Sequence, residues 1–204
     1  NTWIHYRKGA YSISSGYSFV HSDGYRENSA YDRHNLQLFL ALNKKKLEIN
    51  LLLHIIDVHG YIQSSLNLEI FSLSPEKAAS NWLSVKGFES YARLLSGLKS
   101  NYSFTNSLST TTILYGNLFD AYESRPFNIL DDNSLRLGLK SYFTYKKGGF
   151  SLRSGIDYMF ENYKWSIFET NEGVEGEELN SFRETRVPFS LFIQSELDIN
   201  SKLI

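Results

Sequence analysis

The chain has 204 residues, with 21 Lys and Arg, 22 Asp and Glu, and a formal net charge of −1 at pH 7. With so small a net charge, the chain has no overall positive potential that would attract nucleic acid. The lack of cysteine excludes disulfides and thiolate metal sites within these residues. No run of about 18 apolar residues occurs, which excludes a transmembrane helix, whereas 14 Tyr and 14 Phe favour β-structure.

Apolar and polar residues begin to alternate near the start of the chain. In "AYSISSGYSFV", residues 10–20, the side chains of Tyr11, Ile13, Tyr17 and Phe19 share one parity, and small polar residues take the other. Successive side chains of a strand point to opposite faces, so a period of two predicts a strand with one apolar and one polar face.

The same period recurs to the end of the chain. After the opening residues and 10–20, it covers 34–42, 47–56, 93–104, 134–145, 150–163 and 189–199. The segment 108–122 is ambiguous, because apolar residues occupy both parities. The pattern predicts nine strands and the start of a tenth.

The connections between these strands alternate in length. Short turns are expected at 7–9, 43–46, 105–107, 146–149 and 200–202, and long polar loops at 21–33, 58–91, 122–133 and 164–187. This alternation predicts an up-and-down meander, and closing so long a sheet into a barrel removes its edges. Within 58–91, Ser74 as N-cap and Pro75 at the first helical position predict a short helix.

The two faces of the strands differ in the solvent they suit. A transmembrane barrel has alternating segments of about ten residues, short periplasmic turns, long outer loops and aromatic girdles. Tyr145 and Phe150, which flank a short turn, suit such a girdle. We therefore predict an all-β fold, an antiparallel up-and-down meander that is part of a large transmembrane β-barrel. A soluble β-sandwich is the alternative.

Several stretches resemble the barrel of TonB-dependent outer-membrane receptors. "HSDGYRENSAYDRHNLQL" resembles their early strand, first extracellular loop and returning strand. "GYIQSSL" and "AYESRPFNIL" resemble passages into loops, "GIDYMFENYKWSIFETN" resembles a later strand with an aromatic outer rim, and "FIQSELDINSKL" resembles a strand descending to a periplasmic turn. The likeness covers nearly the whole chain but consists of pattern and short phrases, without an invariant chemical motif.

The resemblance implies that residues 1–204 are a fragment of such a barrel, of about nine to ten strands, with the plug domain, coupling box and remaining strands outside the chain. It implies a Gram-negative cell outer membrane location and active, TonB-coupled uptake of a scarce nutrient, with a ferric siderophore or similar iron chelate first among them. The implied partners are this ligand, the receptor's own plug, the TonB-type complex and outer-membrane lipid. No cofactor or enzyme activity is implied. As an open part of a barrel, the chain alone is expected to aggregate.

Two sets of residues are candidates for this function. In the resembled family, inward charges of the barrel wall contact the plug, which here implies Arg93, Lys99, Arg136, Lys140, Arg153, Asp157 and Glu161. Aromatic and basic groups at outer strand ends and loops suit planar anionic ligands, through stacking and bidentate hydrogen bonds. The residues of this kind are Tyr25, Arg26, Tyr61, Gln63 and Arg125. The alternative is that they are loop residues without a ligand role.

The other polar clusters carry no catalytic or metal assignment. His54, Asp57 and His59 lie close in sequence at a strand end, and Glu172, Glu175, Glu177 and Glu178 share a loop, but neither spacing matches a known metal motif. A passive porin or surface-binding barrel, which lacks a plug, is a second functional reading. A barrel hydrolase is a third, and it requires an activated Ser or an Asp/His pair near the rim.

Overall fold

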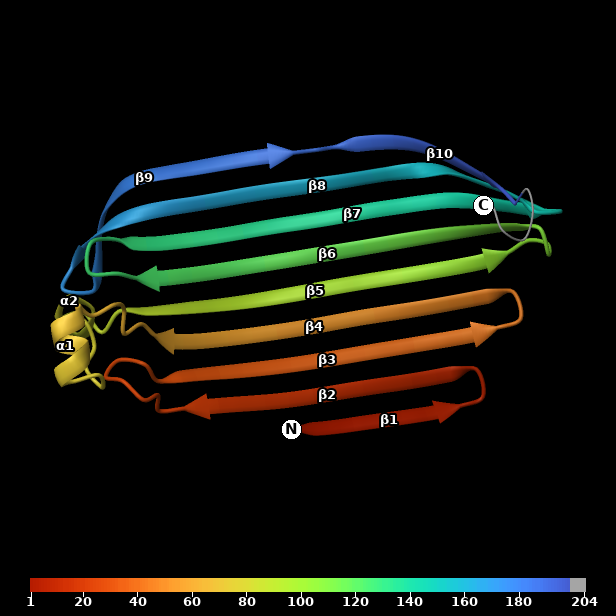
Figure 1. Cartoon of the computed structure of the whole chain (residues 1–204). Coiled ribbons are helices and arrows are strands. Elements are labelled where there is room, and N and C mark those ends of the chain that lie inside the picture. Colours follow the sequence, from red (N-terminus) through yellow and green to blue (C-terminus); the bar gives the residue numbers. More distant parts are fainter. Residues whose placement is uncertain (199–204) are drawn as a thin grey trace.

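The structure, a computed structural model, describes residues 1–198 as one antiparallel sheet a single layer thick (Figure 1). The strands follow each other across the sheet in chain order up to β8, which pairs with both β9 and β10. Their bounds are β1 (Thr2–Lys8), β2 (Tyr11–Ser22), β3 (Tyr31–Lys44), β4 (Leu47–Tyr61), β5 (Phe88–Ser103), β6 (Leu108–Ser124), β7 (Ile129–Lys147), β8 (Phe150–Asn171), β9 (Val174–Arg186) and β10 (Phe189–Leu197). The predicted antiparallel meander is confirmed.

The last two strands are one pass of the chain, interrupted at Val187 and Pro188. β9 pairs with residues 161–171 of β8, and β10 pairs with residues 150–158 of the same strand. The amide of Met159 still donates to the carbonyl of Pro188 at 3.0 Å. Proline has no N–H to donate, so it is tolerated here because this pass lies at the edge of the described sheet.

Two of the predicted long loops are wrong. Residues 164–187 form the outer part of β8, a turn with Glu172 and Gly173 at positive φ, and β9, while only residues 125–128 connect β6 and β7. Polar residues occupy both faces in these segments, so no apolar period marks them as strands. Their backbone groups nonetheless pair within the sheet, where β8 pairs with β9 and β6 pairs with β7.

The predicted short turns at 7–9, 43–46, 105–107 and 146–149 are confirmed, and they lie together at one end of the sheet (Figure 1). Gly9, Gly148 and Gly149 have positive φ, which glycine adopts without a steric penalty. The fifth turn, at 200–202, lies outside the described residues. The longer connections, 23–30 and 62–87, are at the opposite end.

The prediction of a short helix within residues 58–91 is confirmed, but its predicted start, with Ser74 as the N-cap, is wrong. Ser74 is the C-cap of α1 (Leu68–Leu73), which begins after Asn67, whose side chain accepts the amide of Ile70 at 2.8 Å. A Ser–Pro pair fits a helix start, but proline also follows helix ends because it cannot continue them. A second helix, α2 (Ser80–Ser84), precedes β5. No helix among residues 1–198 is long and apolar enough to cross a membrane.

The sheet has almost no core of its own. Ala78 and Ile129 are the only buried hydrophobic residues of the described part, and the chain exposes 13629 Å². A compact monomer of 23.5 kDa exposes roughly 9,800 Å². A two-layered soluble sandwich would bury its apolar residues between the layers, so that alternative does not fit residues 1–198.

Strand register gathers the aliphatic residues on one side, here called the apolar face. Leu40, Leu51, Leu98, Leu114 and Leu139 are direct cross-strand neighbours across five strands. The band they belong to spans eight residue steps on β4, from Leu47 to Ile55, or roughly 26 Å at about 3.3 Å per residue. This matches the apolar belt of about 25 Å that membrane barrels turn toward lipid.

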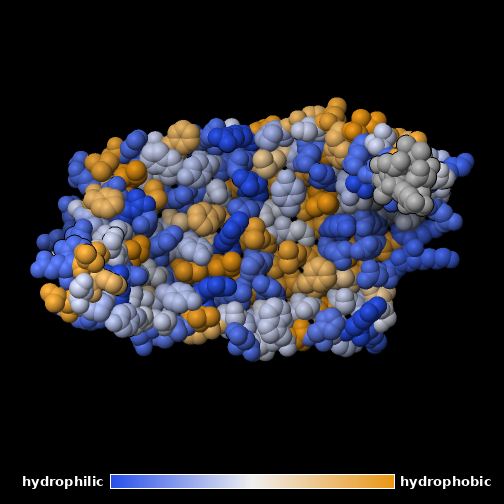
Figure 2. All heavy atoms as spheres, viewed as in Figure 1, coloured by the Kyte–Doolittle hydropathy of each residue, from blue (hydrophilic) through white to orange (hydrophobic). Residues whose placement is uncertain are grey.

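The opposite side, here called the polar face, carries the alternate residues of every strand. Figure 2 shows this face, on which hydrophilic and hydrophobic residues are mixed along its whole length. Beyond the apolar band the strands become polar on both sides: Asp57, Asp120, Asn133 and Lys164 take the apolar-face parity there. The end of the sheet that carries the long connections, here called the outer part, therefore extends beyond the band.

Candidate functional site: the polar face of the sheet

The seven charged residues expected to face the barrel interior all lie on the polar face, as the register shows. Four of the seven form two cross-strand ion pairs. The Arg136 guanidinium pairs with the Glu161 carboxylate, its Nε lying 3.0 Å from Oε1, and Lys140 Nζ lies 3.3 Å from Asp157 Oδ2. Arg93 Nε donates to Asn117 Oδ1 at 2.8 Å. Whether they contact a plug stays a prediction.

Two cations of the polar face also lie over aromatic rings. The Arg153 guanidinium is 5.3 Å from the centre of the Tyr142 ring, and Lys140 Nζ is 5.2 Å from the centre of the Phe192 ring. Such cation–π contacts contribute on the order of 0.5–1 kcal/mol at exposed sites. They hold both side chains against β7 and β10 and keep their charge on the polar face.

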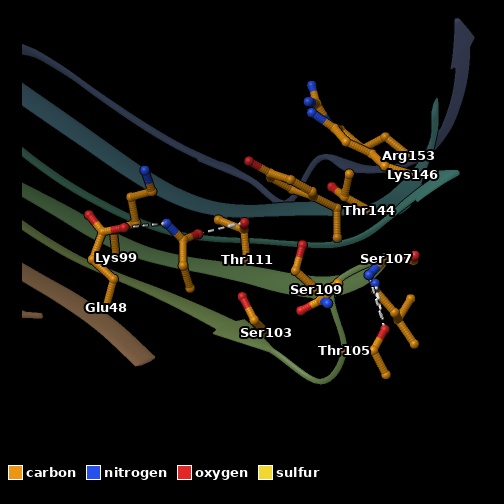
Figure 3. A pocket seen from close by; sticks show the side chains of 14 residues that line it. Glu48, Lys99, Ser103, Thr105, Ser107, Ser109, Thr111, Thr144, Lys146 and Arg153 are labelled. Atoms are coloured by element: carbon orange, nitrogen blue, oxygen red, sulfur yellow. Dashed lines mark hydrogen bonds between the residues drawn. The ribbon is translucent and has the colours of Figure 1, made fainter. Parts of the chain in front are cut away.

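A polar hollow of about 430 Å³ lies on this face near the short turns (Figure 3). Glu48 accepts hydrogen bonds from Asn50 at 2.8 Å and from Asn101 at 3.2 Å, and Asn101 accepts one from Thr111 at 2.7 Å. Lys99, Lys146 and Arg153 line the same hollow, where Glu48 is the single acidic residue. The hollow therefore suits carboxylate or carbonyl groups, the chemistry expected of a polar segment seated inside a barrel.

A second hollow, of about 460 Å³, opens on the outer part of the polar face, between Glu161, Tyr163, Phe182, Glu184 and Arg186. The stacked rings of Trp165 and Phe182, 6.1 Å apart and inclined at 24°, form an aromatic shelf beside it. The hydrogen bond from Arg186, at 2.6 Å, lowers the pKa of the Glu184 carboxyl. The pair is therefore charged at neutral pH.

By resemblance, the sequence interpretation placed Trp165 in a strand with an aromatic outer rim, but it missed the stacking of Trp165 on Phe182 that forms this shelf. It assigned residues 164–187 to a loop, in which side chains have no fixed side. A signal was nonetheless present, because Tyr163, Trp165 and Ile167 continue the parity of Asp157 and Glu161 along β8. Extending that parity would have placed Trp165 on the polar face.

The five predicted ligand residues do not converge on one site. Tyr25, in the 23–30 loop, is 76% exposed, and Tyr61 lies on the apolar-face side, where its ring contacts His59 and Phe88. The backbone carbonyl of Gln63 accepts a hydrogen bond from the backbone amide of Ala79 at 2.9 Å. Arg125 pairs with Glu123 and lies 6.0 Å from the centre of the Phe127 ring. Their ligand role stays a prediction.

Arg26, the fifth of them, ties the two outer loops together. Its Nε donates to the carbonyl of Lys77 at 2.8 Å and its Nη1 to that of Ser64 at 2.9 Å. Nearby, the Asn28 amide donates to the carbonyls of Ile62 and Gly87 at 2.8 and 2.9 Å. These bonds join the 23–30 loop to the 62–87 loop, so the outer end carries one connected loop unit.

Arg26→Ala is expected to lower the free energy of opening of the 62–87 loop by about 2–3 kcal/mol, because charged hydrogen bonds contribute about 1.5–3 kcal/mol each. Amide hydrogen exchange of the full-length protein measures this. Tyr25→Ala is the control, since that exposed neighbour makes none of these bonds. Unchanged exchange in Arg26→Ala would contradict the structural role.

The predicted histidine and acidic clusters are not brought together as a metal site. His54 lies on the polar face, where its Nε2 donates to Asn35 Oδ1 at 2.6 Å, whereas Asp57 and His59 lie on the other side. Among residues 1–198, no group of three or more His, Cys, Asp or Glu is placed to hold a metal ion. The carboxylate of Glu175, which lies in β9, instead accepts a hydrogen bond from Tyr122 at 3.3 Å.

Comparison with known proteins finds likeness in structure alone. No family model matches the sequence, and neither does any curated protein. The unliganded ferric citrate transporter FecA is similar at a TM-score of 0.63 and 14% identity, over 92% of this chain and 30% of its own. BauA, the ferric preacinetobactin receptor of Acinetobacter baumannii, gives 0.67 and 9%, over 96% and 36%.

The copper transporter OprC is similar at a TM-score of 0.65 and 13% identity, over 94% of this chain and 30% of its own. The chain therefore spans about a third of these structures. All three are TonB-dependent receptors, so the predicted resemblance is confirmed at the level of the fold. At such identities the likeness concerns the fold and not the cargo.

Proposed function

Because the sheet has the barrel-wall fold of TonB-dependent receptors, we propose that this chain is part of an outer-membrane receptor for active, TonB-coupled uptake of a scarce nutrient. The observation that carries the proposal is the division of one continuous sheet into a lipid-type apolar band and a charged polar face. In this reading residues 1–204 are one segment of the barrel, and the plug and remaining strands belong to the rest of the protein.

The proposed cargo is a ferric siderophore or a similar iron chelate. FecA and BauA carry ferric ligands by their descriptions, whereas OprC is described as a copper transporter, and RagAB, at a TM-score of 0.59 and 11% identity, as a peptide transporter. The aromatic shelf and the Arg186 guanidinium suit a planar, oxygen-rich chelate through stacking and hydrogen bonds. The protein acts in this proposal as a transporter without catalytic chemistry.

Uptake by cells with and without the full-length protein tests the proposal. Cells are offered ferric citrate, ferric hydroxamates, ferric catecholates, copper and short peptides. Loss of the protein is expected to abolish saturable uptake of one ferric chelate, and so is collapse of the inner-membrane proton gradient. Uptake that survives collapse of the gradient would favour the passive porin, and copper or peptide uptake alone would overturn the iron assignment.

Trp165→Ala and Phe182→Ala are each expected to raise the chelate concentration for half-maximal uptake about 2- to 10-fold, because aromatic stacking contributes about 0.5–1.5 kcal/mol. Lys164→Ala is the matched control, since Lys164 precedes Trp165 but faces the other side of the sheet. Surface amounts of each variant are measured alongside. Equal effects of all three substitutions would place the ligand elsewhere.

A further inference from the structure

The small net charge of the chain conceals a gradient between the two ends of the sheet. The turns 7–9, 43–46 and 146–149 hold seven of the 21 Lys and Arg residues and no Asp or Glu. At the opposite end, residues 164–187 hold six Glu against three Lys and Arg. The short-turn end is therefore cationic and the loop end acidic.

Three of these lysines lie on the apolar face, at the last residue of a strand, and each faces an apolar or aromatic neighbour. Lys8 is directly opposite Tyr11, Lys44 opposite Leu47, and Lys147 opposite Phe150. The arrangement thus repeats in three of the hairpins closed by short turns. Within residues 1–198 none of the three forms a salt bridge, and all three are exposed.

Aromatic residues surround these lysines on the same face. Tyr6, Tyr11, Phe143, Tyr145 and Phe150 lie toward the short turns, and each exposes a third or more of its surface. Long lysine stems lie along apolar surface while their ammonium groups extend to the polar boundary. A row of this kind marks the boundary between acyl chains and headgroups.

We propose that this lysine–aromatic edge binds the phosphate groups of anionic glycerophospholipids in the membrane leaflet at the short-turn end. The proposal rests on the proposed function, because it requires the apolar band to lie in a bilayer. Charge complementarity selects the headgroup, and continuity with the band selects a lipid over a soluble acidic partner, since a phospholipid offers the phosphate and the acyl chains together. Each lysine near an anionic membrane surface favours binding about fivefold.

Retention of lipid by the full-length protein tests this edge. The protein is reconstituted with equal amounts of phosphatidylglycerol and phosphatidylcholine, and the lipids that co-purify in mild detergent are quantified. The wild type is expected to enrich phosphatidylglycerol, and raising the salt concentration is expected to weaken the enrichment. K8Q/K147Q is expected to reduce it by up to roughly 30-fold, and K8R/K147R to preserve it.

R7Q/K146Q is the matched control. Arg7 and Lys146 are the sequence neighbours of Lys8 and Lys147, and they lie on the polar face, so this double variant removes the same charge from the other side. It is expected to leave the enrichment within about twofold of the wild type, since its cations are remote from lipid. Heat-dependent gel mobility reports whether each variant is folded.

The outcomes separate this inference from the function it rests on. Equal losses in the two double variants, or a wild type that retains both lipids alike at every salt concentration, would overturn the lysine edge while leaving the receptor proposal intact. A protein that extracts into buffer without detergent and retains neither lipid would overturn both.

Discussion

Leu51→Arg in the full-length protein is expected to lower the free energy of unfolding in a lipid bilayer by about 2–4 kcal/mol, the cost of a cation at the bilayer midplane of a barrel. Leu52→Arg is expected to change it by less than about 1 kcal/mol, because lumen-side cations stay in water or a polar plug. The two leucines are adjacent in sequence and differ only in the face of β4 that they occupy.

The neighbours of the two positions give the physical reason. Leu51 lies between Leu40 and Leu98 in the middle of the apolar band, whereas Leu52 lies between Phe39 and Gly97 on the polar face and is 45% exposed. Denaturant titration in phospholipid vesicles measures both variants, and Leu51→Met is a volume-conserving control. Equal destabilisation by the two arginines would mean that both faces are buried alike, which would contradict a membrane barrel.

The 204-residue chain produced alone in buffer without detergent is expected to form large aggregates and no stable monomer. Within the described residues β1 and the β9–β10 pass each have a strand on one side only, so a row of backbone donors and acceptors is open at each edge. The apolar band adds a wide exposed hydrophobic surface, of the size that marks interaction or aggregation. Both features favour association.

Light scattering and sedimentation measure this outcome. Mild detergent is expected to cover the band and reduce the particle size, because detergent replaces the acyl chains of a membrane. The same chain within the full-length protein is the control, since further barrel strands would pair both edges. A monodisperse, β-rich chain in plain buffer would show that these residues bury their own apolar surface, and the barrel reading would then be lost.

Part of the site was open to prediction from sequence, because a strand period of two assigns a side to every residue once one side is known. The parity of Leu135 and Phe143 sufficed to put Arg136 and Lys140 on one face. The same rule was not applied to Tyr61. It continues the parity of Leu53 and Asp57, so its place on the apolar-face side could have been predicted from the sequence. Ser74 was not readable, because the same Ser–Pro pair fits a helix start and a helix end.

The sequence by itself determined the strand period, the two faces and the end at which the tight turns lie, since these depend on residues one to four positions apart. The tertiary structure decided which side chains meet. Arg136 reaches Glu161, and Trp165 stacks on Phe182, only through the pairing register of β7, β8 and β9. That register depends on the turn lengths and on the irregular pairing at Phe168. A local sequence pattern does not predict it, because the hydrogen bonds of the register join residues on different strands.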